Sequence, residues 1–95
     1  MTARIIDGKA YAAGLRSRIA SAATTLKTAH DITPGLAVIL IGGDPASAIY
    51  VGAKGKAARE VGFNAIDIRL PTTISENALL AEIDRLNNDR SVSGI

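Results

Sequence analysis

Ser47, Tyr50 and Lys54 carry the side chains of this sequence that are best suited to chemistry. They follow one another at steps of three and four residues, which on an α-helix places side chains on one face. A lysine amine beside a sheet can exchange protons with a substrate once it is partly desolvated, and a tyrosine ring can stack on a flat substrate. The three residues therefore predict a substrate site served by one helix.

The neighbouring segments predict where this site lies. Leu36–Ile41 is a continuous apolar run, typical of a strand that is covered on both faces. The helix follows from about residue 45 to residue 61. Its small and apolar side chains are expected to press on the sheet, namely Ala46, Ile49, Ala53 and Ala57. The three polar side chains would then lie at the rim, beyond the carboxyl end of the strand, where open α/β sheets bind ligands.

Plainer interpretations of the same residues stay open. Tyr50 and Lys54 also fit an ordinary solvated pair on an amphipathic helix, and Ser47 fits a first-turn residue that bonds to the backbone. Gly42 and Gly43 follow the apolar run as in a phosphate loop. However, the sequence has neither Gly-x-Gly-x-x-Gly nor the Lys-Ser/Thr of a P-loop, so nucleotide binding by this segment is not predicted. Arg59 and Lys56 are expected to be solvated.

Alternating helical and extended patterns run through the whole chain. The predicted elements are an extended piece at 3–6, a helix at 9–29 behind Asp7, strands at 36–41 and 64–70, the helix at 45–61, and a helix from a capping box at Thr73–Glu76 to about Asn88. The order β-α-β-α-β-α predicts an α/β fold of three layers, α-β-α, around a parallel sheet. Another strand is due at Gly94-Ile95, so residues 1–95 are interpreted as an incomplete N-terminal domain.

Composition excludes several classes of function. The chain has no cysteine, which excludes disulfides and thiolate metal sites, and no metal site is predicted. The net charge of +2 comes from scattered residues without a basic run, so nucleic acid is not an expected partner. The longest apolar run is too short to span a bilayer. A cytoplasmic protein without membrane or nucleic-acid partners is expected.

One string of residues is specific enough to identify a family. The segment Gly42-Gly-Asp-Pro-Ala-Ser47, followed by Tyr50-Val-x-x-Lys54 and Lys56-Ala57, closely resembles the bifunctional methylenetetrahydrofolate dehydrogenase/methenyltetrahydrofolate cyclohydrolase family. The similarity extends to Ile6-Asp-Gly-Lys9 at the start and to Val92-Ser-Gly-Ile95 at the end. Gly52 departs from the pattern, because many members carry arginine there.

The resemblance implies a role for each residue of the predicted site. It implies that Tyr50 packs on the aromatic part of a folate and that Lys54 acts in the proton transfers of the cyclohydrolase reaction, with Ser47 supporting the start of the helix. It also implies a full-length homodimer in one-carbon metabolism and purine biosynthesis, with a tetrahydrofolate derivative as substrate. NADP would be bound by a Rossmann domain that lies outside this sequence, so no cofactor-binding residue is predicted here.

Two other functions also fit the sequence. The first is a non-catalytic α/β binding module. The second is a short-chain dehydrogenase, suggested by Tyr50-x-x-x-Lys54, but the glycine-rich nucleotide turn that such an enzyme needs near the N-terminus is missing. The isolated 95-residue chain is expected to be inactive as a dehydrogenase. It is also expected to be marginally stable or to associate through an open sheet edge.

Overall fold

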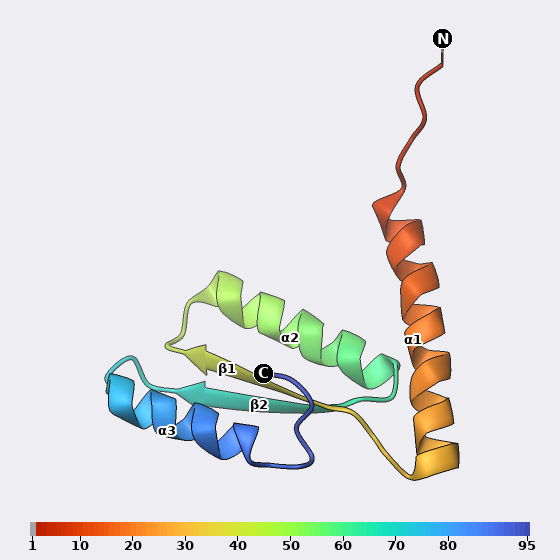
Figure 1. Cartoon of the computed structure of the whole chain (residues 1–95). Coiled ribbons are helices and arrows are strands. Elements are labelled where there is room, and N and C mark those ends of the chain that lie inside the picture. Colours follow the sequence, from red (N-terminus) through yellow and green to blue (C-terminus); the bar gives the residue numbers. More distant parts are fainter. Residues whose placement is uncertain (1) are drawn as a thin grey trace.

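The computed structural model describes residues 2–95 and contains helices on a short parallel sheet (Figure 1). The elements are α1 (Gly8–His30), β1 (Gly35–Ile41), α2 (Pro45–Glu60), β2 (Asn64–Leu70) and α3 (Glu76–Asn87). The two strands pair in parallel along their full length, from Gly35 opposite Asn64 to Ile41 opposite Leu70. The predicted α/β fold with a parallel sheet is confirmed, and the predicted helices and strands are found close to their expected bounds.

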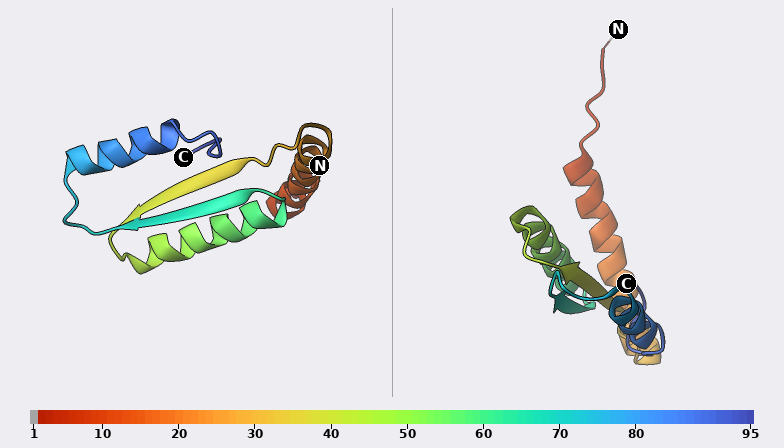
Figure 2. Two further views of the ribbon diagram at one scale, coloured as in Figure 1. Left: turned by 90° about the horizontal axis from the view of Figure 1, so that it is seen from below. Right: turned by 90° about the vertical axis from the view of Figure 1, so that its left-hand side faces the viewer.

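The helices α2 and α3 cover opposite faces of this sheet (Figures 1 and 2). Successive side chains of a strand point to opposite faces. Accordingly, Leu36 lines a hollow together with Ala57 and Ala58 of α2, whereas Ile39 lines a groove together with Leu79 of α3. The predicted α-β-α layers are therefore present. The best-buried side chains sit between them, with Ala37 fully buried and Leu86 1% exposed.

Helix α1 stands beside these layers and gives the molecule an elongated shape (Figure 2). The Asp7 carboxylate caps it by accepting a hydrogen bond from the Ala10 amide at 3.0 Å. The second half of α1 packs on the end of α2, where Ala23 is buried beside Gly62. The first half extends past the sheet, so Tyr11 and Leu15 are exposed.

The first strand of the predicted order is absent. Residues 3–6 belong to no helix or strand, and the side chains of Ile5 and Ile6 are each 93% exposed. They precede the end of α1 that points away from the sheet (Figure 1), so no strand is close enough to pair with them. The prediction of a first strand at Ala3–Ile6 was wrong for that reason.

Residues 94–95, where a further strand was predicted, contain an isolated bridge to the sheet. Gly94 forms a parallel bridge with Leu36 on the edge of β1 that faces away from β2. The Ala37 amide donates a hydrogen bond to the Gly94 carbonyl at 2.9 Å. In this arrangement the odd-numbered residues of β1 turn their backbone groups toward this edge. Beyond Ala37, the edge is therefore where a further strand would pair.

Gly52 is a place where the chain can be stabilised. It lies inside α2, and a Cβ built on it would meet no atom within 4 Å. We expect Gly52→Ala to raise the free energy of unfolding by about 0.5–1 kcal/mol, because glycine has more backbone freedom to lose than alanine. Urea unfolding measures this change in the free energy of unfolding. Gly62→Ala is the control: its φ of +92° disfavours a side chain, so that variant should be destabilised. A lower midpoint for Gly52→Ala would contradict the prediction.

Candidate functional site

The start of α2 is fixed by a local hydrogen-bond network. Asp44 is the N-cap, and its carboxylate accepts hydrogen bonds from the Ser47 amide at 3.0 Å and from the Ser47 hydroxyl at 2.9 Å. These two bonds, the amide bond being the stronger influence, hold the pKa of Asp44 below its usual value. Ser47 thus lies in the first turn, but its hydroxyl bonds to the Asp44 carboxylate, where the plainer interpretation had it bond to the backbone.

The loop before α2 requires glycine at one position. Gly42 has a φ of +82°, and a Cβ there would lie 2.8 Å from Cγ2 of Thr72. A side chain would thus be disfavoured both by the backbone conformation and by the neighbouring loop. The loops that follow β1 and β2 therefore pack directly on each other at the carboxyl end of the sheet.

The face of α2 that packs on the sheet differs from the predicted one. Ile49 is 74% exposed, and Ala46 and Ala53 are also exposed. The buried face instead contains Ala48, Val51, Gly55 and Ala58, of which Ala48 is half-buried. At about 100° per residue, the helix is turned by roughly half a revolution from the expected orientation. The small side chains at 55 and 58 explain this, since they let the helix lie close to the strands.

Arg59 also departs from expectation, because it is not simply solvated. Its guanidinium lies 3.8 Å from the Asp67 carboxylate on β2. Its atoms also lie 3.3–3.6 Å from the place where a Cβ of Gly55 would be. Gly55 therefore leaves the space through which Arg59 reaches across the helix toward the sheet.

Lys54 lies on the rim of a groove of about 330 Å³ beside the open edge of β1. The groove runs between α2 and α3 and is lined by Ala37, Val38, Ile39, Ile41, Lys54, Leu79, Ile83 and Ile95. None of the ion pairs formed within residues 2–95 involves Lys54. Among the residues that line the groove, Lys54 has the one charged side chain.

The other predicted residues lie apart from this groove. Tyr50 is 67% exposed and is not among the groove-lining residues. It lies one turn before Lys54 on the same flank of α2, and Ser47 lies a further turn back. Ser47, Tyr50 and Lys54 were predicted to lie beyond the carboxyl end of β1, whereas the groove that Lys54 lines extends along the edge of that strand. Its α3 wall consists of Leu79 and Ile83.

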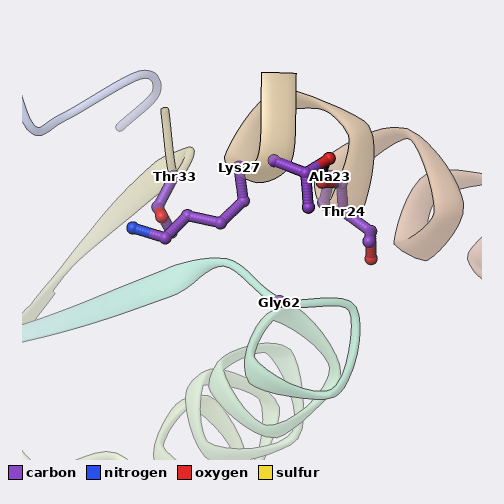
Figure 3. Close-up of a pocket in the computed structure, with 6 residues that line it drawn as sticks. Ala23, Thr24, Lys27, Thr33 and Gly62 are labelled. Atoms are coloured by element: carbon purple, nitrogen blue, oxygen red, sulfur yellow. Dashed lines mark hydrogen bonds between the residues drawn. The ribbon is translucent and has the colours of Figure 1, made fainter. Parts of the chain in front are cut away.

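A second hollow lies at the foot of α1, between that helix and the turn at Gly62, and has a volume of about 330 Å³ (Figure 3). The Lys27 amine pairs with Asp31 at 2.9 Å. The Thr24 and Thr28 hydroxyls donate to backbone carbonyls of the preceding turn. Three of the four polar side chains that line this hollow therefore already have partners inside the chain, and Thr33 is the fourth.

Comparison with known proteins points to one family. A family model of the tetrahydrofolate dehydrogenase/cyclohydrolase catalytic domain matches residues 6–95. The bifunctional protein FolD of Cereibacter sphaeroides is 59% identical over the whole chain, which spans 32% of that relative. The chain thus spans about a third of the length of the curated relatives it matches.

Solved structures show the same similarity in three dimensions. The FolD methylenetetrahydrofolate dehydrogenase/cyclohydrolase of Campylobacter jejuni has a TM-score of 0.91 and 43% identity, over 94% of this chain and 31% of that one. The Trypanosoma brucei dehydrogenase-cyclohydrolase, described in complex with NADP and an inhibitor, has a TM-score of 0.91 and 32% identity, over 100% of this chain and 33% of that one. The chain therefore belongs to the tetrahydrofolate dehydrogenase/cyclohydrolase family.

Proposed function

We propose that this chain supplies the folate-binding part of a bifunctional one-carbon enzyme. That enzyme oxidises 5,10-methylenetetrahydrofolate to the methenyl form with NADP and hydrolyses the product to 10-formyltetrahydrofolate. The observation that carries the proposal is the helix α2, on which Ser47, Tyr50 and Lys54 lie at successive turns in a chain of this family. The relatives, which are called bifunctional, support it.

Lys54 is the proposed proton-transfer group of the hydrolysis. Water adds to the methenyl carbon and loses both of its protons as the formyl C=O forms; the folate nitrogen that leaves this carbon gains one proton, and the other is released to the solvent. An amine that alternates between its neutral and charged forms can take a proton from the water and deliver one to the nitrogen. Lys54 is exposed on the rim of an apolar groove and takes part in none of the ion pairs within residues 2–95, so its amine is accessible to a substrate.

Tyr50 is the proposed binding surface for the flat part of the substrate. Its ring is exposed on the flank of α2 that also carries Lys54. A folate placed across this flank would contact the ring with its aromatic portion and bring its one-carbon group to the amine. Ser47 supports both residues by fixing the first turn of the helix through Asp44.

The residues of this chain do not fit an NADP site. The loop between β1 and α2 has Gly42 and Gly43, but the dinucleotide fingerprint is missing from the sequence. We therefore assign the cofactor to another part of the full-length protein, and no hydride-transfer step is derived from these residues. The support for NADP is the Trypanosoma brucei relative, which is described as bound to it.

The cellular location, oligomeric state and partners of the enzyme are part of the same proposal. We assign it to the cytoplasm, as a homodimer, with a folate as its small-molecule partner and without nucleic acid or membrane partners. Within residues 2–95, no helix has the length and apolar character needed to cross a membrane.

Substitution of Tyr50 tests the proposed binding surface. In the full-length enzyme we expect Tyr50→Ala to raise KM for methylenetetrahydrofolate about threefold to tenfold, because an aromatic contact contributes about 0.5–1.5 kcal/mol. Tyr50→Phe keeps the ring and should stay within about twofold of the wild type. Tyr11→Ala is a matched control, since Tyr11 on α1 is 71% exposed and Tyr50 67%. If Tyr50→Ala leaves KM unchanged, the ring does not bind the substrate.

A further inference from the structure

The N-terminal arm, residues 3–6, is a segment that lies apart from the rest of the described chain. It belongs to no helix or strand, and each of its residues is exposed. Its large apolar side chains, Ile5 and Ile6, are each 93% exposed. Figure 1 shows the arm running on from the end of α1 that points away from the sheet. Isoleucine favours strands, so the arm has the character of a strand that its own sheet cannot reach.

Strand β1 offers the matching feature, an edge with available backbone groups. The Ala37 amide donates to the Gly94 carbonyl, so the odd-numbered residues of β1 direct their backbone groups to the edge away from β2. Within residues 2–95, no strand pairs with this edge beyond the bridge at Gly94. The open edge is therefore that of residues 38–41. At about 3.3 Å per residue, it has the length of the arm.

An apolar groove of about 330 Å³ lies beside the same edge. Apart from Lys54, it is lined by apolar side chains, which include Ile39, Ile41, Leu79, Ile83 and Ile95. Adjacent side chains of a strand point to opposite faces of the sheet. If the arm pairs with the open edge, one of its two isoleucines therefore enters this groove, and the other lies on the face that α2 covers.

The other edge of the sheet is less suited to a new strand. It belongs to β2, which carries Asp67 and Arg69, and the Asp67 carboxylate lies 3.8 Å from the guanidinium of Arg59. Charged side chains on an edge strand discourage pairing with another chain. Strand β1 has neither a charged residue nor a proline. The open edge of β1 is therefore the edge that a further strand can use.

We propose that the arm of one copy of this chain pairs with the open edge of β1 in a second copy, and that the two copies exchange arms. Because α1 holds the arm away from its own sheet, the contact forms between copies (Figure 1). A reciprocal exchange uses the same two surfaces twice and closes the assembly at a dimer. The contact needs only residues of this chain, so it does not depend on the proposed folate chemistry.

Sedimentation equilibrium of the 95-residue chain tests the proposal. We expect a monomer–dimer equilibrium, and the double variant Ile5→Ser/Ile6→Ser should raise its Kd at least about tenfold, because two aliphatic side chains are no longer removed from water. Both residues are exposed within one copy, so the fold should not change. Ile32→Ser/Ile49→Ser is the matched control and should dimerise as the wild type does. Ile32 and Ile49 are 52% and 74% exposed, and neither lines the groove.

Hydrogen exchange of the Ile39 amide distinguishes arm exchange from other modes of association. At dimer-forming concentrations, we expect this amide to exchange at least about tenfold more slowly in the wild type than in Ile5→Ser/Ile6→Ser, because the arm accepts its hydrogen bond. A wild-type chain that stays monomeric, or equal exchange of Ile39 in both proteins, would overturn the proposal. So would unchanged dimerisation of the double variant, which would indicate direct pairing of two β1 edges. Since no readout uses folate, the proposed enzymatic function is tested separately.

Discussion

Replacing Lys54 by methionine in the full-length enzyme should lower the rate of methenyltetrahydrofolate hydrolysis by at least about a hundredfold, the lower range for loss of a general acid-base group. Methionine keeps an unbranched apolar side chain beside the groove, so the packing around Ile39 and Ile83 is preserved while the exchangeable proton is lost. The rate is measured from the decay of the methenyl absorbance after mixing.

Lys56→Met provides the matched control for this loss. Lys56 lies on the same helix, is exposed, and is not among the residues that line the groove. Its replacement should leave hydrolysis within about twofold of the wild type, as expected for a surface substitution. If Lys54→Met and Lys56→Met hydrolyse the substrate equally well, Lys54 does not transfer the proton.

Replacing Gly35 by alanine should cause the largest loss of stability. A Cβ at this position would lie 1.9 Å from the backbone oxygen of Ser91 and 3.0 Å from its carbonyl carbon. Because the obstacle is backbone, the segment that leads to Gly94 must move away from β1. Its hydrogen bonds go with it, including the one from the Ala37 amide to Gly94. We expect the free energy of unfolding to fall by at least about 2 kcal/mol.

Urea unfolding and hydrogen exchange measure the two effects of Gly35→Ala separately. The unfolding midpoint reports stability, and faster exchange of the Ala37 amide reports loss of the bond to Gly94. Gly43→Ala is the control, because a Cβ at Gly43 meets nothing within 4 Å, and it should change stability by no more than about 0.5 kcal/mol. Similar stability of both variants would show that residues 91–94 do not pack on Gly35.

The elements could be predicted because their ends are marked by local chemistry. Asp7 was expected to cap a helix, and its carboxylate accepts a hydrogen bond from a first-turn amide. Asp44, which was not predicted as a cap, does the same for α2. The start of α3 was misplaced slightly. The expected capping box began at Thr73, whereas the N-cap is Ser75, whose hydroxyl accepts from the Ala78 amide at 3.1 Å. Neighbouring Thr and Ser residues can each serve as a cap, so spacing alone did not choose between them.

The orientation of α2 could not be predicted, because small or apolar residues lie on nearly every side of this helix. Ile49 is the largest aliphatic side chain of the predicted face, yet it is exposed, and Gly55 is buried. Close approach to the strands selects the face with the smallest side chains, and only the tertiary contacts show this. Tyr50 and Lys54 still lie on the same flank of α2, as predicted, because this depends on helical spacing and not on which face packs on the sheet.

The groove beside β1 could not be predicted from sequence periodicity, because its lining residues come from several separate elements. Its lining comes from α2, α3 and β1 together with Ile95, which follows the bridge at Gly94. Helical spacing places Leu79 and Ile83 on one face of α3, but it could not show that Lys54 lines the same groove. Parallel topology and the bridge at Gly94 bring these residues together.

The central claim is that the full-length protein joins folate oxidation to hydrolysis at a site that includes Lys54. It is tested most directly by incubating the purified full-length enzyme with methylenetetrahydrofolate and NADP and measuring both products over time. The account predicts equimolar NADPH and 10-formyltetrahydrofolate, with the methenyl form as an intermediate, and accumulation of that intermediate in Lys54→Met. Absence of NADPH formation by the wild type, or unchanged 10-formyltetrahydrofolate production by Lys54→Met, would contradict it.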